Sequence, residues 1–132
     1  MPARMDQAST LLNAVAANGV STAKDISDYK HVMVEVAGNA AADLLLRFQI
    51  SISETAPNFG AAQSMTNRWD YVHVWDYQNA VGITGDTGLP FAAAADNRNF
   101  LINIDGIKWF SVEVSAYVAG AVTVVCRAFN NQ

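Results

Sequence analysis

The sequence has little cysteine and little charge, and each shortage excludes a class of protein. Its 132 residues include one cysteine, Cys126, so no disulfide can form within the chain, which suits a reducing compartment. Charged residues make up 15% of the chain, the net charge is −4, and the basic residues are scattered from Arg4 to Arg127. A protein that binds nucleic acid through phosphates needs a basic stripe, so we expect no nucleic-acid partner.

Long apolar runs are also missing. The longest, around Ala116–Cys126, falls well short of the roughly 18–20 residues that span a bilayer, so we expect no membrane partner. The first ten residues, MPARMDQAST, contain no apolar signal-peptide core, which predicts a protein made and used without secretion. A hydrophobic content of 52% predicts one globular domain that buries roughly two-thirds of its unfolded surface.

What the chain does have, from Lys30 onward, is alternation of apolar and polar residues with a period of two. Successive side chains of a strand point to opposite faces, so this pattern predicts half-buried strands. The predicted buried faces are Val32, Val34 and Val36; Leu44, Leu46, Phe48, Ile50 and Ile52; Phe100, Ile102 and Ile104; Phe110, Val112, Val114 and Ala116; and Val122, Val124, Cys126 and Ala128. Seven or eight such strands predict an all-β, single-domain antiparallel β-sandwich, with a jelly-roll topology preferred and an immunoglobulin-like sandwich as the alternative.

Turn residues separate the predicted strands. Asp105-Gly106 predicts a hairpin between the runs on either side, and Gly120 joins the next pair, so we expect the last three strands to form a meander. Segment 54–70, ETAPNFGAAQSMTNRWD, predicts a long connection, and loops of that length are usually functional or mobile.

The first nineteen residues follow neither pattern clearly and could form a short helix or an edge strand. We expect residues 1–19 to be an N-terminal arm and residues 20–132 to be the β-sandwich domain. The apolar anchors of this arm are Leu11, Leu12 and Val15.

Candidate catalytic residues are few. Asp86-Thr87-Gly88 is the tripeptide that each subunit of a dimeric aspartic protease contributes, but Gly85 before it and Leu89-Pro90 after it favour a simple turn in which Asp86 bonds nearby amides. His31 and His73 are isolated and lack metal-ligand spacing. We therefore expect no catalytic residue, no metal and no cofactor; a small hydrolase using Asp86 or His73 is the alternative.

Cys126 shares its parity with Val122 and Val124, which predicts a buried, inert thiol.

The most unusual segment is RWDYVHVWDYQ, in which Trp69, Tyr71, Trp75 and Tyr77 share one parity of a strand. One interpretation is that one face of this strand packs on the core while the other lies under a loop. The other is an aromatic, weakly charged interface, because Trp and Tyr are enriched in interface hot spots. The candidate interface contains these four aromatic residues and Leu11, Leu12 and Val15.

Residues 101–129, LINIDGIKWFSVEVSAYVAGAVTVVCRAF, resemble the C-terminal hairpins of small tailed-bacteriophage virion proteins, and residues 9–38 and 44–53 are similar to the same group. The resemblance is to capsid cement or decoration proteins of jelly-roll type. It implies a non-enzymatic structural protein, made in the host cytoplasm and located on the capsid exterior. The implied partners are the major capsid protein and a second or third copy of the chain, as a dimer or trimer. Segment 54–70 departs from the pattern. A head-fibre or tail-associated receptor-binding jelly-roll module is the alternative.

Overall fold

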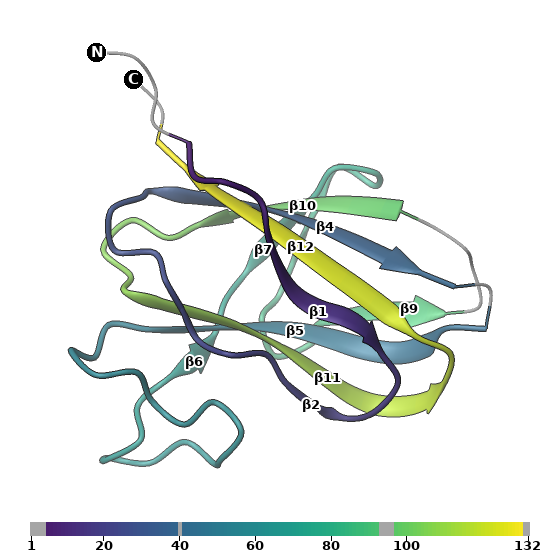
Figure 1. Cartoon of the computed structure of the whole chain (residues 1–132), viewed down its shortest axis with the longest axis horizontal. Coiled ribbons are helices and arrows are strands. Elements are labelled where there is room, and N and C mark those ends of the chain that lie inside the picture. The colour runs from purple at the N-terminus through teal and green to yellow at the C-terminus, as the bar shows by residue number, and fades with distance from the viewer. Residues whose placement is uncertain (1–4, 40, 93–96, 131–132) are drawn as a thin grey trace.

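The computed structural model describes residues 5–39, 41–92 and 97–130, which form two antiparallel sheets packed face to face (Figure 1). Sheet A contains, in spatial order, β1 (Ser9–Val15), β12 (Val122–Phe129), β4 (His31–Gly38), β10 (Asn97–Asn103), β7 (Val74–Asp76) and β8 (Val81–Ile83). Sheet B contains β2 (Gly19–Val20), β11 (Trp109–Ala119), β5 (Asp43–Ser51) and β6 (Asp70–Tyr71), while β3 (Lys24–Asp25) pairs with β11 and β9 (Leu89–Ala92) with β5. The predicted all-β sandwich is confirmed.

Helices are absent from the described residues, so none of these residues forms a helix long and apolar enough to cross a membrane.

The strands pair in a nested order, the first with the last. β1 pairs with β12, β2 with β11, β4 with β10 and β5 with β9, all antiparallel. The remaining short strands extend these pairs: β3 and β6 in sheet B, and β7 and β8 in sheet A. A long hairpin that is folded over on itself produces this order, which is the jelly-roll arrangement preferred from the sequence.

The nested order overturns the predicted hairpin at Asp105-Gly106. The chain does turn there, with Gly106 at a φ of +86° and the Ile107 N–H donating to the Ile104 carbonyl oxygen at 2.8 Å. However, β10 lies in sheet A and β11 in sheet B, and β12 then returns to sheet A. The predicted meander is therefore wrong as well. Turn residues specify only that the chain reverses, whereas the pairing partner is chosen by the burial of each strand's apolar face.

The core between the sheets follows the predicted alternation closely. Val32, Val34 and Val36 of β4 and Phe100 and Ile102 of β10 are fully buried, and so are their counterparts across the sandwich, such as Leu46, Phe110 and Val112. The Phe48 ring of sheet B lies 6.2 Å, between centroids, from both Phe100 and Phe110, so aromatic contacts join the two sheets.

Two of the predicted core positions lie outside it. Ile52 is 73% exposed because β5 ends at Ser51, one residue earlier. Ala116 is exposed because β11 is irregular there: its pairing with β5 shifts between Ser115 and Ala119, and Ala116 has a φ of +48°. A break in regular pairing ends the alternation that the prediction assumed.

Residues 9–15 of the predicted arm are β1, an edge strand of sheet A. Leu12 is 6% exposed and belongs to the core, while Leu11 and Val15 pack against it. The backbone just before β1 also runs alongside β12, because the Asp6 N–H donates to the Ala128 carbonyl oxygen at 2.9 Å. Lys24 Nζ of β3 donates to Asp6 Oδ2 at 3.1 Å, and this contact holds the pKa of Asp6 below its usual range. Over these residues the segment is part of the sandwich rather than separate from it.

Cys126 is fully buried in β12, as predicted, and its burial raises the pKa of the thiol to about 11. A thiol reagent attacks the thiolate and needs access to it, so we expect labelling of Cys126 only through unfolding of the protein. The measurement is the labelling rate under native conditions and at increasing urea concentration. A Cys126→Ala, Thr10→Cys variant, which has an exposed thiol on β1, serves as the fast-reacting control. Equally rapid labelling of folded parent and control would contradict the buried assignment.

Candidate interaction surfaces

Asp86 lies in an exposed turn between β8 and β9, so the predicted turn is confirmed, but among the described residues its carboxylate does not bond the nearby amides as expected. The Gly88 N–H donates to the Thr84 carbonyl oxygen at 3.0 Å, and Gly88 has a φ of +71°. A Cβ at Gly88 would lie 2.5 Å from Arg47 Cγ, so both the conformation and the space require glycine here. The Asp86 carbonyl oxygen accepts a hydrogen bond from Arg47 Nη1 at 3.4 Å, which joins this turn to β5.

The two histidines have separate surroundings. His31 begins β4, and its ring stacks on Phe129 with 5.2 Å between the centroids. His73 lies between β6 and β7, exposed, beside Gly82 of β8, where a Cβ would lie 2.3 Å from the imidazole ring. Within the described ranges, no three His, Cys, Asp or Glu side chains gather in a group that could hold a metal ion.

The aromatic run is divided between the two sheets. Tyr71 belongs to β6 in sheet B, whereas Trp75 belongs to β7 in sheet A, and the chain crosses between the sheets at residues 72–73. Trp69 and Tyr71 therefore lie together on one side of the sandwich, and Trp75 and Tyr77 lie on the other. The shared parity that the sequence suggests does not make a single aromatic face, because the predicted continuous strand is two short strands.

On sheet A, Trp75 and Tyr77 belong to an outer surface that we call the Trp75 face. One row of cross-strand partners runs from Arg127 through Met33 and Leu101 to Trp75. In the next row Val125 and Asn99 flank Glu35, and the Tyr77 N–H donates to the Asn99 carbonyl oxygen at 3.2 Å. The face is defined by these residues: Met33, Glu35, Trp75, Tyr77, Asn99, Leu101, Val125 and Arg127.

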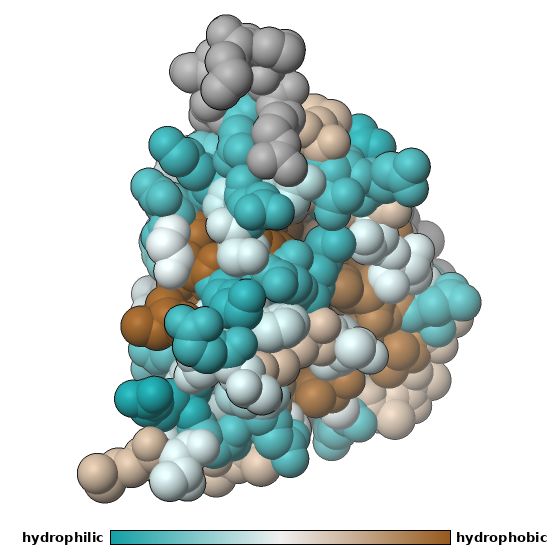
Figure 2. Space-filling model, turned by 60° about the vertical axis from the view of Figure 1, so that its left-hand side comes forward, coloured by the Kyte–Doolittle hydropathy of each residue, from teal (hydrophilic) through white to brown (hydrophobic). Residues whose placement is uncertain are grey.

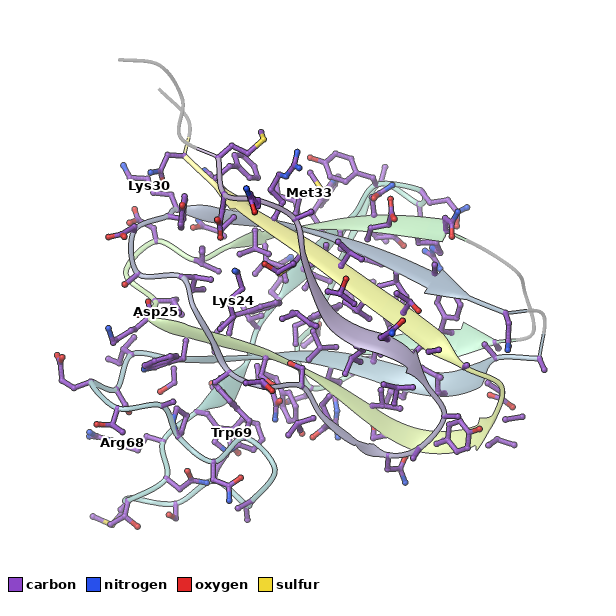
Figure 3. All side chains as sticks on the ribbon, in the orientation of Figure 1. Lys24, Asp25, Lys30, Met33, Arg68 and Trp69 are labelled. Carbon is purple, nitrogen blue, oxygen red and sulfur yellow. The ribbon has the colours of Figure 1, made fainter. Side chains whose placement is uncertain are left out.

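The Trp75 face has the composition of a contact surface. Trp75 is 41% and Tyr77 50% exposed, and Glu35 and Arg127 are the face's only charged side chains. A hollow of about 480 Å³ lies at the β12 side of this face, away from Trp75 and Tyr77, and its lining includes Met33, Glu35 and Arg127. Figure 3 shows Met33 on the sheet A side of the molecule, opposite Trp69 on the sheet B side.

Asp76 fixes the position of this aromatic pair. It is 1% exposed, and its carboxylate accepts hydrogen bonds from the backbone N–H groups of Gln78 and Asn79 and from the Asn79 side chain, at 3.0, 3.4 and 2.9 Å. It also forms an ion pair with Arg98 of β10. Because Asp76 lies between Trp75 and Tyr77, these bonds hold both side chains on the outer face.

On sheet B, the outer face carries a connected polar cluster. Arg47 of β5 and Glu113 of β11 are cross-strand neighbours, joined by Nε–Oε1 and Nη2–Oε1 contacts of 2.9 and 2.8 Å. The Tyr71 hydroxyl donates to Glu113 Oε2 at 2.9 Å, and the Arg47 guanidinium lies 4.2 Å from the centroid of the Tyr71 ring. Burial and the neighbouring Glu113 raise the pKa of Tyr71 to about 12. Arg47 and Glu113 are 66 positions apart in the sequence. No pattern in the sequence predicts that these two side chains and Tyr71 meet.

The long segment 54–70 covers part of this outer face. Phe59 is 4% exposed, and its carbonyl oxygen accepts a hydrogen bond from Nε2 of the fully buried Gln49 at 3.0 Å. Asn67 ties the segment together, since its side chain donates to the carbonyl oxygens of Asn58 and Ala62. Together with β2, β5, β6 and β11, this segment encloses a hollow of about 510 Å³, which we call the sheet B groove; its lining includes Arg47, Ala62, Trp69, Tyr71, Glu113 and Ser115.

A third hollow lies at the end of the sandwich where β5 ends. Its volume is about 530 Å³, and it is lined by Ile50, Ile52 and Ile107 together with Glu54 and Arg68. Figure 2, which brings this end of the molecule forward, shows hydrophobic side chains in separate patches between hydrophilic ones. Small apolar patches of this kind are ordinary on protein surfaces, so this hollow by itself indicates no partner.

The chain matches no protein-family model and no curated protein. Solved structures with the same fold include the SPBc2 prophage-derived protein YomS, which is 12% identical with a TM-score of 0.70 over 98% of this chain and 96% of YomS. Another is the PBSX exported protein XepA, 14% identical with a TM-score of 0.71 over 98% of this chain and 39% of XepA. This chain thus spans well under half the length of XepA. At these identities the likeness shows a shared fold.

We expect Asp76→Ala to lower the free energy of unfolding by about 3 kcal/mol, because removal of one partner leaves the largely buried Arg98 guanidinium unpaired. Urea unfolding measures the change. Asp105→Ala, at an exposed turn position, is the matched control and should shift stability by less than about 0.5 kcal/mol. Similar small changes in both variants would contradict the role of Asp76.

The Tyr71 hydroxyl predicts a dependence of stability on alkaline pH. Its folded pKa of about 12 lies above the ordinary value of 10, so its contribution is fully present below pH 10 and is lost as the pH rises through 12. We therefore expect the stability difference between the parent and Tyr71→Phe to shrink over that interval. Unfolding by urea at a series of pH values measures it, and a difference that stays constant from about pH 9 to 12 would count against this assignment.

Proposed function

We propose that this protein is a non-enzymatic structural protein of a bacteriophage virion that decorates the capsid exterior and bridges neighbouring coat subunits. The observation that carries the proposal is the Trp75 face, where exposed Trp75 and Tyr77 side chains stand on a rigid sheet with one acidic and one basic neighbour. Aromatic residues in a weakly charged surrounding are typical of the centre of an interface.

Attachment to a shell also suits the size of this surface. A face formed from four strands of a small sandwich buries a modest area, so its contact with one free coat subunit is weak. A closed shell presents two or more subunits to each copy, and binding to both at once multiplies the affinity without any new kind of contact. Self-association as a dimer or trimer would add further contacts of the same kind.

The structural neighbours give the proposal its context. YomS is a prophage-derived protein that is matched over nearly its whole length, so a single sandwich of this fold occurs as a prophage-derived protein. Under the proposal the chain is made in the host cytoplasm and resides on the virion. XepA is described as exported, which favours a second candidate: a phage protein released from the cell and free of particles.

Sedimentation of the purified protein with undecorated particles, and separately with unassembled coat subunits, tests the proposal. We expect binding to particles at least ten-fold tighter than binding to subunits, because only the shell allows bridging. Equal affinity for both would exclude bridging. An absence of binding to particles, together with protein found only in the particle-free fraction of a lysed culture, would reject decoration in favour of the second candidate.

The docking face can be tested on the same particles. Truncation of an aromatic hot spot costs about 2 kcal/mol or more, so Trp75→Ala should weaken particle binding at least about thirty-fold while the sandwich stays folded. Val118→Ala is the matched control, because Val118 is 69% exposed yet lies on β11, outside the Trp75 face. If both variants bind as the parent does, the Trp75 face is not the docking surface.

A further inference from the structure

Segment 54–70 carries the most exposed large apolar side chain of the described residues, Met65, which is 93% exposed. Figure 1 shows the segment projecting from the sandwich at the end where β5 finishes, and Figure 3 shows Arg68 and Trp69 in this projecting part. No residue from Thr55 to Asn67 is charged. An apolar side chain in a projecting, uncharged segment is suited to a contact that removes it from water.

Hydrogen bonds hold Met65 at the apex of a turn. The backbones of Ser64 and Asn67 bond each other, with N–H to carbonyl distances of 3.1 and 3.3 Å, and Met65 and Thr66 lie between them. The Asn67 side chain accepts from the Asn58 N–H at 2.8 Å and donates to the Asn58 carbonyl oxygen at 2.9 Å. Because the turn is ordered before a partner arrives, a contact through Met65 costs little conformational entropy.

The hollow of about 530 Å³ at the same end, which we call the end hollow, provides an apolar socket. Its lining includes Ile50, Ile52 and Ile107, and Ile52 is 73% exposed. After Met65, Ile52 is the most exposed large apolar side chain of the described residues. One end of the molecule therefore carries both a projecting apolar side chain and an apolar hollow.

The charges around the end hollow also suit a second copy of the chain. Glu54 and Arg68 both line it and are exposed, yet neither forms an ion pair with any residue that the structure describes. Arg68 follows Met65 by three positions, so a copy that brings Met65 to the hollow also brings a cation toward Glu54. Each copy has a net charge of −4, and the uncharged segment reduces the repulsion where two copies meet.

From these features we propose that copies of this chain bind one another, with Met65 of one copy inserted between Ile50, Ile52 and Ile107 in the end hollow of another. A surface that contains both the projecting side chain and the hollow is self-complementary, which a two-fold contact requires. The contact lies outside the Trp75 face. It goes beyond capsid decoration and is measured on the free protein, so the two proposals can fail separately.

Sedimentation equilibrium of the full chain measures the association. Concentrations from about 1 to 500 µM bracket the dissociation constant on the order of 10 µM that we expect for a contact of modest area. Met65→Asp should weaken the association at least about ten-fold, because the burial of the methionine is lost and a charge enters an apolar hollow.

Val118→Asp is the matched control, because it adds the same charge at a position that is 69% exposed. Val118 lies at the other end of sheet B, where Ala119 pairs with Asp43. This variant should associate as the parent does. A parent that stays monomeric over the whole concentration range, or equal weakening in the two variants, would overturn the proposal.

Disulfide trapping locates the contact. A Met65→Cys variant is mixed with an Ile52→Cys variant and oxidised by copper–phenanthroline and dissolved oxygen; both positions are exposed, whereas the native Cys126 is buried. A disulfide needs the two Cβ atoms within about 4.5 Å, so the mixture should form linked chains at least about ten-fold faster than Met65→Cys mixed with Val118→Cys. Non-reducing electrophoresis measures both rates. Equal rates in the two mixtures would show that Met65 does not enter the end hollow.

Discussion

The other features of the structure depend on one interaction, the burial of two apolar sheet faces against each other. Strands β4, β10 and β12 form the face of sheet A, and strands β5 and β11 form the face of sheet B. The packing of these faces buries Phe100 and Phe110 completely and brings the Phe48 ring into contact with both. Because each strand must present its apolar face to the same core, consecutive strands can lie on opposite sides of it. The nested jelly-roll pairing and the crossing at Asp105-Gly106 follow from that requirement.

With both inner faces used in the core, partners can act on the outer faces and on the ends of the sandwich. The Trp75 face lies on sheet A, whereas segment 54–70 joins two strands of sheet B and projects on the opposite side, so contact with one leaves the other open. A protein held on a shell through sheet A would therefore leave segment 54–70 free.

Each outer surface is held by an ion pair that also positions aromatic rings. The Asp76–Arg98 pair sets Trp75 and Tyr77 on sheet A, and the Arg47–Glu113 pair sets Tyr71 on sheet B. Polar side chains with several bonds each fix a geometry more tightly than apolar contact alone, because a displaced charge would lose its partners. Ser115 differs from these groups, since its hydroxyl is buried without such bonds.

The sequence by itself determined most of the buried side chains and where the chain turns. Val32, Phe100 and Cys126 are in the core because the period of two is a local property of a strand, and Asp86 is in a turn for a similarly local reason. Only the tertiary structure decided which strands pair. It placed Tyr71 and Trp75 on opposite sheets, made β1 an edge strand, and joined Arg47 to Glu113 across 66 positions. Pairing partners are distant in sequence and are selected by the shared burial of both sheets, which no local pattern encodes.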